Sequence, residues 1–126
     1  MTDLSQLKAF DLCYVATPFT LYEAGLEAAF IDACRLMGKL LDAGVTNAIS
    51  PIVEAYPISL HGKLDPLDMS IWKPFCAVRM ARCDALIVGM LLGWSFSRGV
   101  THEIKEMIGK PQFLMNPEIL SFVRDA

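Results

Sequence analysis

Glu103 is the carboxylate with the strongest case for chemistry. If Ser97 caps a helix that begins at residue 98, Glu103 lies in the second turn of that helix. It then borders the buried stripe that contains Val100, Ile104 and Met107. A carboxylate at such a border is partly desolvated, which suits a nucleophile or a general acid or base. The alternative is an ordinary exposed helix residue, and spacing alone does not separate the two interpretations.

Polar, aromatic and glycine residues follow three predicted strands, in segments that a ligand would meet. Compact hydroxyl groups can hydrogen-bond a ligand, and Trp94 offers a stacking surface, although a place in the core suits Trp94 as well. Gly99 lets a ligand approach the start of a helix, where free N–H groups favour oxygen-rich or anionic groups. The candidate binding residues are Thr17, Pro18 and Phe19 after the first strand, Ser50 after the second, and Trp94, Ser95, Ser97 and Gly99 after the third.

Histidines and cysteines give no sign of a metal site. His102 adjoins Glu103 but is expected on another face of the helix, and His61 lies in a predicted loop, where ligand contact and packing are both open. The cysteines form no CxxC pair and have no histidine at metal-ligand spacing, so we expect free thiols in the reducing cytoplasm and no metal. They are Cys13, Cys34, Cys76 and Cys83. The sequence also lacks GxGxxG, phosphate-loop and GxSxG motifs, so we expect no cofactor.

The composition fits one domain, 1–126, with an unusually large apolar share. Hydrophobic residues make up 54% of the chain and charged residues 20%, as a sheet buried on both faces requires. The net charge of −3 argues against nucleic acid as a partner. The apolar run at 84–94 is about half of the ~20 residues that span a bilayer, so no membrane contact is expected. The apolar surplus favours a homodimer or larger homo-oligomer, with the helix near 72–80 among its contacts.

Apolar runs and helical periods divide the chain into alternating strands and helices. Residues 1–10 are expected as a loose leader that touches the body through Leu7 and Phe10. Residues 52–68 are expected as a long loop, functional or mobile, with room for one helical turn. Strands are expected at 12–16, 47–49, 84–91 and 112–115, and helices at 20–43, 69–83, 98–108 and from 117 to the C-terminus.

Several residues have the types that mark helix ends. Thr20 and Glu23 have the spacing of a capping box for the first long helix, and Gly44 is placed as its left-handed C-cap. Pro117 fits the first turn of the last helix, because a helix start has no need of the missing N–H. Pro74 fits a first turn in the same way if the regular part of the helix at 69–83 begins near Lys73.

The alternation of strands and helices predicts an α/β fold with a parallel sheet of four or five strands. The strand that starts at Asp84 is the most apolar, so we expect it at the centre. In open parallel sheets, ligands bind beyond the carboxyl ends of the strands. The functional site is therefore expected in the loops after Tyr14, Ile49 and Leu92.

Three strings, taken together, resemble one protein superfamily. They are YVATPF at 14–19, ISPI at 49–52 and CDALIVGMLLGWSFSRGVTHEI at 83–104. The superfamily is that of the nucleoside 2-deoxyribosyltransferases and related nucleotide N-glycosidases, and the likeness is greatest to small phage and bacterial domains with Gly-Trp after the third strand. The resemblance implies a flavodoxin-like three-layer sandwich. It also implies a Glu nucleophile that attacks the anomeric carbon of a nucleoside, as in a retaining glycosidase.

The resemblance assigns roles to individual residues and exposes two departures. Glu103 matches the nucleophile, Tyr14 matches the tyrosine that orients it, and Asp84 matches a structural aspartate. Ser97 and Cys76 stand where the transferases have aspartates that bind the sugar or base and assist proton transfer. Loss of a general acid typically costs 10²–10⁴-fold in rate.

Three functions remain open at this point. The first is a protein that binds a nucleoside or nucleoside monophosphate and cleaves or transfers at the N-glycosidic bond through Glu103. The second is a non-catalytic module that binds or senses a nucleotide on the same fold. The third is a structural oligomer with a vestigial site. Glu103 and Tyr14 favour the enzyme, whereas Ser97 and Cys76 favour the binding module.

Overall fold

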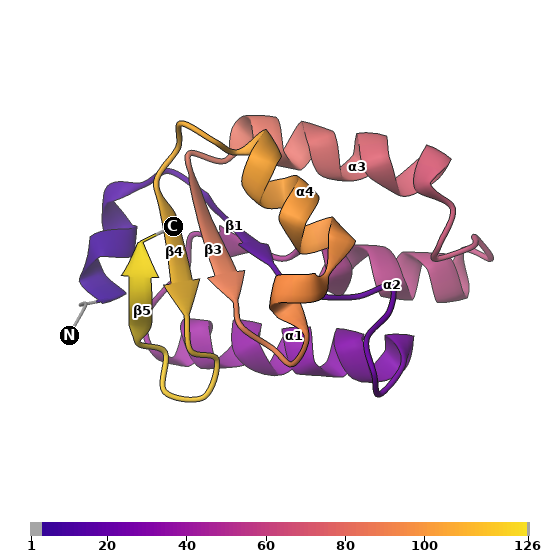
Figure 1. The fold of residues 1–126 in the computed structure, drawn as a ribbon, viewed down its shortest axis with the longest axis horizontal. Coiled ribbons are helices and arrows are strands. Elements are labelled where there is room, and N and C mark those ends of the chain that lie inside the picture. Colours follow the sequence, from indigo (N-terminus) through magenta and orange to yellow (C-terminus); the bar gives the residue numbers. More distant parts are fainter. Residues whose placement is uncertain (1–3, 126) are drawn as a thin grey trace.

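The structure, a computed structural model, describes residues 4–125 and is a three-layer α/β sandwich (Figure 1). The sheet has the order β2-β1-β3-β4-β5, with the first four strands parallel and β5 antiparallel to β4. The strand expected from Asp84 is β3, and it is central as predicted. The expected α/β fold with a five-stranded, mostly parallel sheet is confirmed and is consistent with a flavodoxin-like sandwich, although β5 is antiparallel where a wholly parallel sheet was expected. The elements are η1 (Leu4–Ala9), β1 (Cys13–Ala16), α1 (Leu26–Asp42), β2 (Ala48–Ile49), α2 (Pro51–His61), α3 (Met69–Arg82), β3 (Ala85–Gly89), η2 (Trp94–Phe96), α4 (Arg98–Glu106), β4 (Gln112–Met115) and β5 (Phe122–Asp125).

Side chains alternate across the sheet and form two cores. In β1, Val15 belongs to the core on the α1 face, together with Leu36 of that helix. Tyr14 belongs to the core on the opposite face, together with Met80 of α3 and Val100 of α4. Successive residues of a strand point to opposite faces. Tyr14 therefore faces the layer of α3 and α4, which lies across the sheet from α1 (Figure 1).

The start of α1 differs from the expectation. The helix begins at Leu26, its N-cap is Gly25 at φ 98°, and no side chain caps it. The predicted capping box of Thr20 and Glu23 is therefore wrong, and residues 17–25 form a loop. The Tyr22 hydroxyl holds this loop to α1 by donating a hydrogen bond to Asp32 Oδ2 at 2.7 Å. At the other end Gly44 has φ 89°, as a residue just beyond a helix C-terminus often does.

The expected long loop at 52–68 is mostly helix. Ser50 has extended backbone and its Oγ accepts the N–H of Val53 at 3.4 Å, while Pro51 occupies the first turn of α2. The helix then passes through Pro57, which removes one backbone donor but does not end it. In α3, too, a proline lies inside: the helix starts after Asp68, so Pro74 is beyond the first turn that the sequence suggested.

The last expected helix is a strand. Asn116 Oδ1 accepts the N–H groups of Glu118 and Ile119 at 2.9 and 3.3 Å, which closes a turn. The chain then returns as β5 beside β4, and the ring of Phe122 stacks on that of Phe113 with centroids 4.9 Å apart. This contact is between residues of neighbouring strands, so the local pattern around Pro117 does not reveal it.

Residues 4–10 of the N-terminal segment pack against the body, and residues 1–3 lie outside the described residues. Leu7 is fully buried in the core on the α1 face, and Phe10 packs beside it. Asn47 Nδ2 donates to the carbonyl oxygens of Leu7 and Phe10 at 2.8 and 3.0 Å. The expected contacts of Leu7 and Phe10 are present, but residues 4–9 form a 3-10 helix where a loose leader was expected. Within residues 4–125, no helix has the length and apolarity needed to cross a bilayer.

Gly89 ends β3 in a place where a side chain does not fit. A methyl group there would lie 2.5 Å from Leu36 Cδ2 and 3.0 Å from Thr17 Cγ2. We expect Gly89→Ala to lower the free energy of unfolding by about 1–3 kcal/mol, as overpacking does. Gly38, inside α1, has no atom within 4 Å of such a methyl. Gly38→Ala should stabilise by about 0.5–1 kcal/mol. Urea unfolding of both variants measures the change in the free energy of unfolding. A change of the same sign in both variants would contradict the prediction.

Candidate functional site

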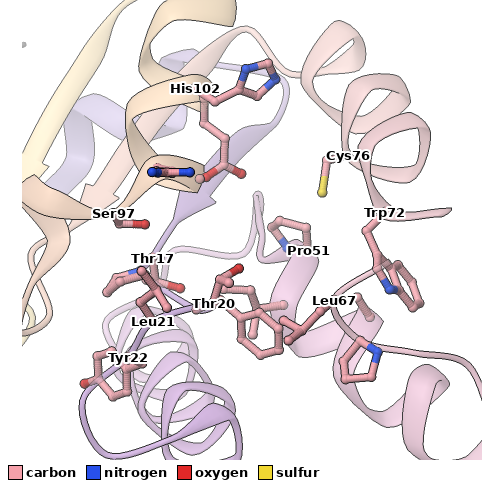
Figure 2. A pocket seen from close by; sticks show the side chains of 18 of the residues that line it. Thr17, Thr20, Leu21, Tyr22, Pro51, Leu67, Trp72, Cys76, Ser97 and His102 are labelled. Carbon is pink, nitrogen blue, oxygen red and sulfur yellow. The ribbon is translucent and has the colours of Figure 1, made fainter. Parts of the chain in front are cut away.

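A cavity of about 770 Å³ opens at the carboxyl ends of β1, β2 and β3 (Figure 2). Its walls come from the loop at 17–25, the starts of α2 and α4, the inner face of α3, and the segment before η2. The volume lies within the range of about 300–1,000 Å³ that is usual for small-molecule sites. The site is thus where a parallel sheet is expected to bind a ligand.

Tyr14 and Glu103 meet at the wall of this cavity. Tyr14 is fully buried on β1, and its hydroxyl donates a hydrogen bond to Glu103 Oε2. Glu103 lines the cavity from the second turn of α4. Ser97 caps this helix as expected, because its Oγ accepts the N–H of Val100 at 3.2 Å. The contact between Tyr14 and Glu103 that the topology predicted is therefore present.

The carboxyl group of Glu103 is poorly solvated. Burial raises its pKa from 4.5 to about 8, although the hydrogen bond from Tyr14 acts in the opposite direction. Burial, followed by the nearby charge of Glu103, raises the pKa of Tyr14 far above its ordinary value. Cys76 lies beside both groups, and burial raises the pKa of its thiol as well. At neutral pH all three side chains are therefore mainly protonated in the free protein.

Thr17, in the cavity wall, has a buried hydroxyl group without a hydrogen-bond partner among the described residues. The whole residue is only 4% exposed. A buried polar group without a partner costs about 1–3 kcal/mol. Because Thr17 belongs to the cavity wall, a ligand atom that reaches Oγ1 is a candidate partner (Figure 2).

The start of α4 offers further donors. The first N–H groups of a helix have no partner within it, and here they belong to Arg98 and Gly99, which line the cavity. Such N–H groups favour oxygen-rich or anionic ligand groups. Ser97 also lines the cavity, so its hydroxyl serves the helix cap at the edge of the site.

The structure brings most of the candidate binding residues together, but not all. Those at the cavity are Thr17, Pro18, Phe19, Ser97 and Gly99, besides Glu103. Three others are outside its lining. Ser50 is 3% exposed and caps α2, Trp94 packs against the core that contains Tyr14, and Ser95 is exposed in η2.

Several cavity residues were missed or placed elsewhere by sequence reasoning. His102 was expected on another face of its helix, yet it lines the cavity between α4 and α3 (Figure 2). Tyr56 was missed because α2 was taken for a loop, although the Ser50-Pro51 pair is a recognisable helix start. Trp72 is 6% exposed and still contributes to the wall.

Among residues 4–125, no group of three or more His, Cys, Asp or Glu side chains is arranged to hold a metal ion. The four cysteines are free thiols.

Fold and site together define an α/β protein with a cavity of small-molecule size at the carboxyl edge of its sheet, where Glu103 lines the cavity and the buried Tyr14 behind it donates a hydrogen bond to Glu103. The chain belongs to the family described as a domain of unknown function (DUF1937), which matches residues 11–116. The match runs from β1 to β4 and includes every candidate site residue. No curated protein and no solved structure matches the chain.

Proposed function

We propose that this protein binds a nucleoside or nucleoside monophosphate and breaks or transfers its N-glycosidic bond. The observation that carries the proposal is the contact of Tyr14 with Glu103 at the cavity, with a carboxyl group that is partly buried and yet open to a ligand. The resemblance of the strings around these residues to nucleoside 2-deoxyribosyltransferases and nucleotide N-glycosidases points to the same chemistry.

In the proposed reaction, an oxygen of the ionised form of Glu103 forms a bond to C1′ of the sugar while the bond from C1′ to the base breaks and its electron pair goes to the base. The base leaves through an oxocarbenium-like transition state, and a glycosyl ester remains on Glu103. Water or a second base then attacks C1′ and releases the carboxylate. Tyr14 holds Oε2, while the Thr17 hydroxyl and the N–H groups at the start of α4 hold the sugar or its phosphate.

A second candidate is a non-catalytic module that binds or senses a nucleotide. It is favoured by the shortage of acids around the carboxyl group of Glu103. The side chain beside that group is Cys76, where catalysis would need a proton donor for the base. For both candidates we propose a cytoplasmic location, because the cysteines are free thiols.

For both candidates we also propose a homodimer or larger assembly, with contacts through exposed residues of α3 such as Val78 (61% exposed).

The test is a screen of nucleosides and their 5′-monophosphates for release of free base, read by chromatography. We expect release from some of them, and a mass increase of one glycosyl unit on the protein when the reaction is quenched early. A thermal shift with a nucleotide, without any base release, would instead support the binding module. Neither binding nor release with any of them would contradict both candidates.

A further inference from the structure

The wall of the cavity points to one class of substrate. We propose that the base bound here carries a positive charge on the ring that is bonded to the sugar, as in a pyridinium nucleoside or an N7-alkylated purine nucleoside. This inference rests on the proposed function and narrows it. Three features of the cavity support it: the shortage of proton donors, the unpaired carboxyl group and the aromatic lining.

The first feature is the shortage of acids. Among the described residues, the cavity lining contains two carboxyl groups, those of Glu23 and Glu103. Glu23 is exposed in the loop before α1, and Glu103 is the proposed nucleophile. On the α3 wall near Glu103 stands Cys76, whose pKa is raised by burial, so its thiol is a weak acid. A neutral base needs a proton to leave, whereas a cationic base does not.

The second feature is the lack of a cation beside Glu103. Within residues 4–125 its carboxyl group has no ion-pair partner, and its acidity depends on burial and on the hydrogen bond from Tyr14. Lys73 and Arg98 line the cavity, but both side chains are exposed, and in such a position they suit the phosphate group of a nucleotide. An opposite charge close to a buried carboxyl group favours its ionised form. A cationic base would thus ionise the nucleophile that a neutral base leaves protonated.

The third feature is the aromatic lining. Phe19 and Tyr56 meet edge to face with ring centroids 5.9 Å apart, and both line the cavity. Trp72 lines it on the α3 side, across from Ser97 (Figure 2). Aromatic rings attract cations through their π faces, and they also stack on planar rings.

The reaction balances without an added acid. A Glu103 oxygen forms a bond to C1′ as the C1′–N bond breaks. The electron pair of that bond goes to the ring nitrogen and cancels its positive charge, so the base leaves neutral. Water then attacks C1′, the ester bond breaks with its electron pair returning to Glu103, and the proton of the water passes to solvent.

The test compares 7-methylguanosine with guanosine, which differ by one methyl group and one ring charge. Nicotinamide riboside serves as a second cation, and each nucleoside is also tried as its 5′-monophosphate. Each rate of base release is divided by the rate without protein. We expect the acceleration to be at least about 100-fold greater for the cationic member, the lower end of what a general acid contributes.

Two variants locate the proton donor. Cys76→Asp should increase release of guanine selectively, because it supplies the missing acid, and circular dichroism checks that this variant folds. His102 also lines the cavity, so His102→Gln tests the rival donor. Equal acceleration of both nucleosides, or guanine release that is lost in His102→Gln, would overturn this inference and leave the proposed function standing. No release from any charged or neutral nucleoside would overturn both.

Discussion

Glu103→Gln is expected to reduce base release by at least about 10³-fold in kcat/KM, because an amide keeps the shape of the side chain but cannot form the glycosyl ester. Binding should persist, since Thr17 and the start of α4 are unchanged. The measurement is chromatographic release of base from the best nucleoside of the screen, with binding followed by thermal shift.

Glu106→Gln is the matched control for this loss. Glu106 is the last residue of the same helix, is exposed, and lies outside the cavity lining. The same carboxylate-to-amide change there should leave kcat/KM within about twofold, as expected for a surface position far from the reacting atoms. If Glu103→Gln kept more than a tenth of the activity, Glu103 would not be the nucleophile.

Glu103 is also expected to make the protein less stable as the pH rises. Its pKa is about 8 in the folded protein, against 4.5 as the ordinary value. Between these values the folded protein keeps a proton that the unfolded chain has lost. The stabilisation is therefore fully present below about pH 4.5 and disappears as the pH rises through about 8. Its size is on the order of 3–5 kcal/mol, from the free energy equivalent of such a shift.

Glu103→Gln should remove this dependence, because an amide stays neutral at every pH. We expect the variant to match the wild type near pH 5 and to be clearly more stable near pH 9. Thermal unfolding from pH 5 to 9 measures the difference, again with Glu106→Gln as the control that follows the wild type. Parallel curves for Glu103→Gln and the wild type would show that the carboxyl group is well solvated.

The two results together separate a working site from a structural one. A substitution that removes activity while it stabilises the fold is typical of a residue kept for chemistry at a cost in stability. A stabilising Glu103→Gln in a protein without any base release would instead favour the binding module, because a ligand can use a buried carboxyl group without reacting.

Local patterns were sufficient for the elements that build the site. β1 and β3 are continuous apolar runs, and β4 is apolar after Gln112; such runs are typical of parallel strands buried on both faces. The cap at Ser97 and the periodicity after it placed α4 correctly, and with it Glu103 at the border of the buried stripe. Since parallel strands share one carboxyl edge, these elements were enough to predict that Tyr14 and Glu103 would meet.

Local patterns failed where a residue had two acceptable structures. Pro57 disfavours a helix interior, yet the cap at Ser50 and the packing of Tyr56 on Phe30, with ring centroids 5.1 Å apart, accompany a helix at 51–61. Asn116 suits a helix start and a turn equally, and the choice depends on Phe122 reaching Phe113, a contact between neighbouring strands.

The tertiary structure alone decided where two side chains of the region lie, those of Trp94 and His102. Trp94 packs against the core, which is one of its two expected places, whereas His102 lines the cavity and was expected on another face of its helix. The sequence gives the angle between successive side chains around a helix axis, but it does not give which of them faces the sheet. That depends on how α4 packs on the sheet. The same packing encloses the carboxyl group of Glu103 and leaves the hydroxyl of Thr17 without a partner, so the chemistry of the site arises from the assembly of all three layers.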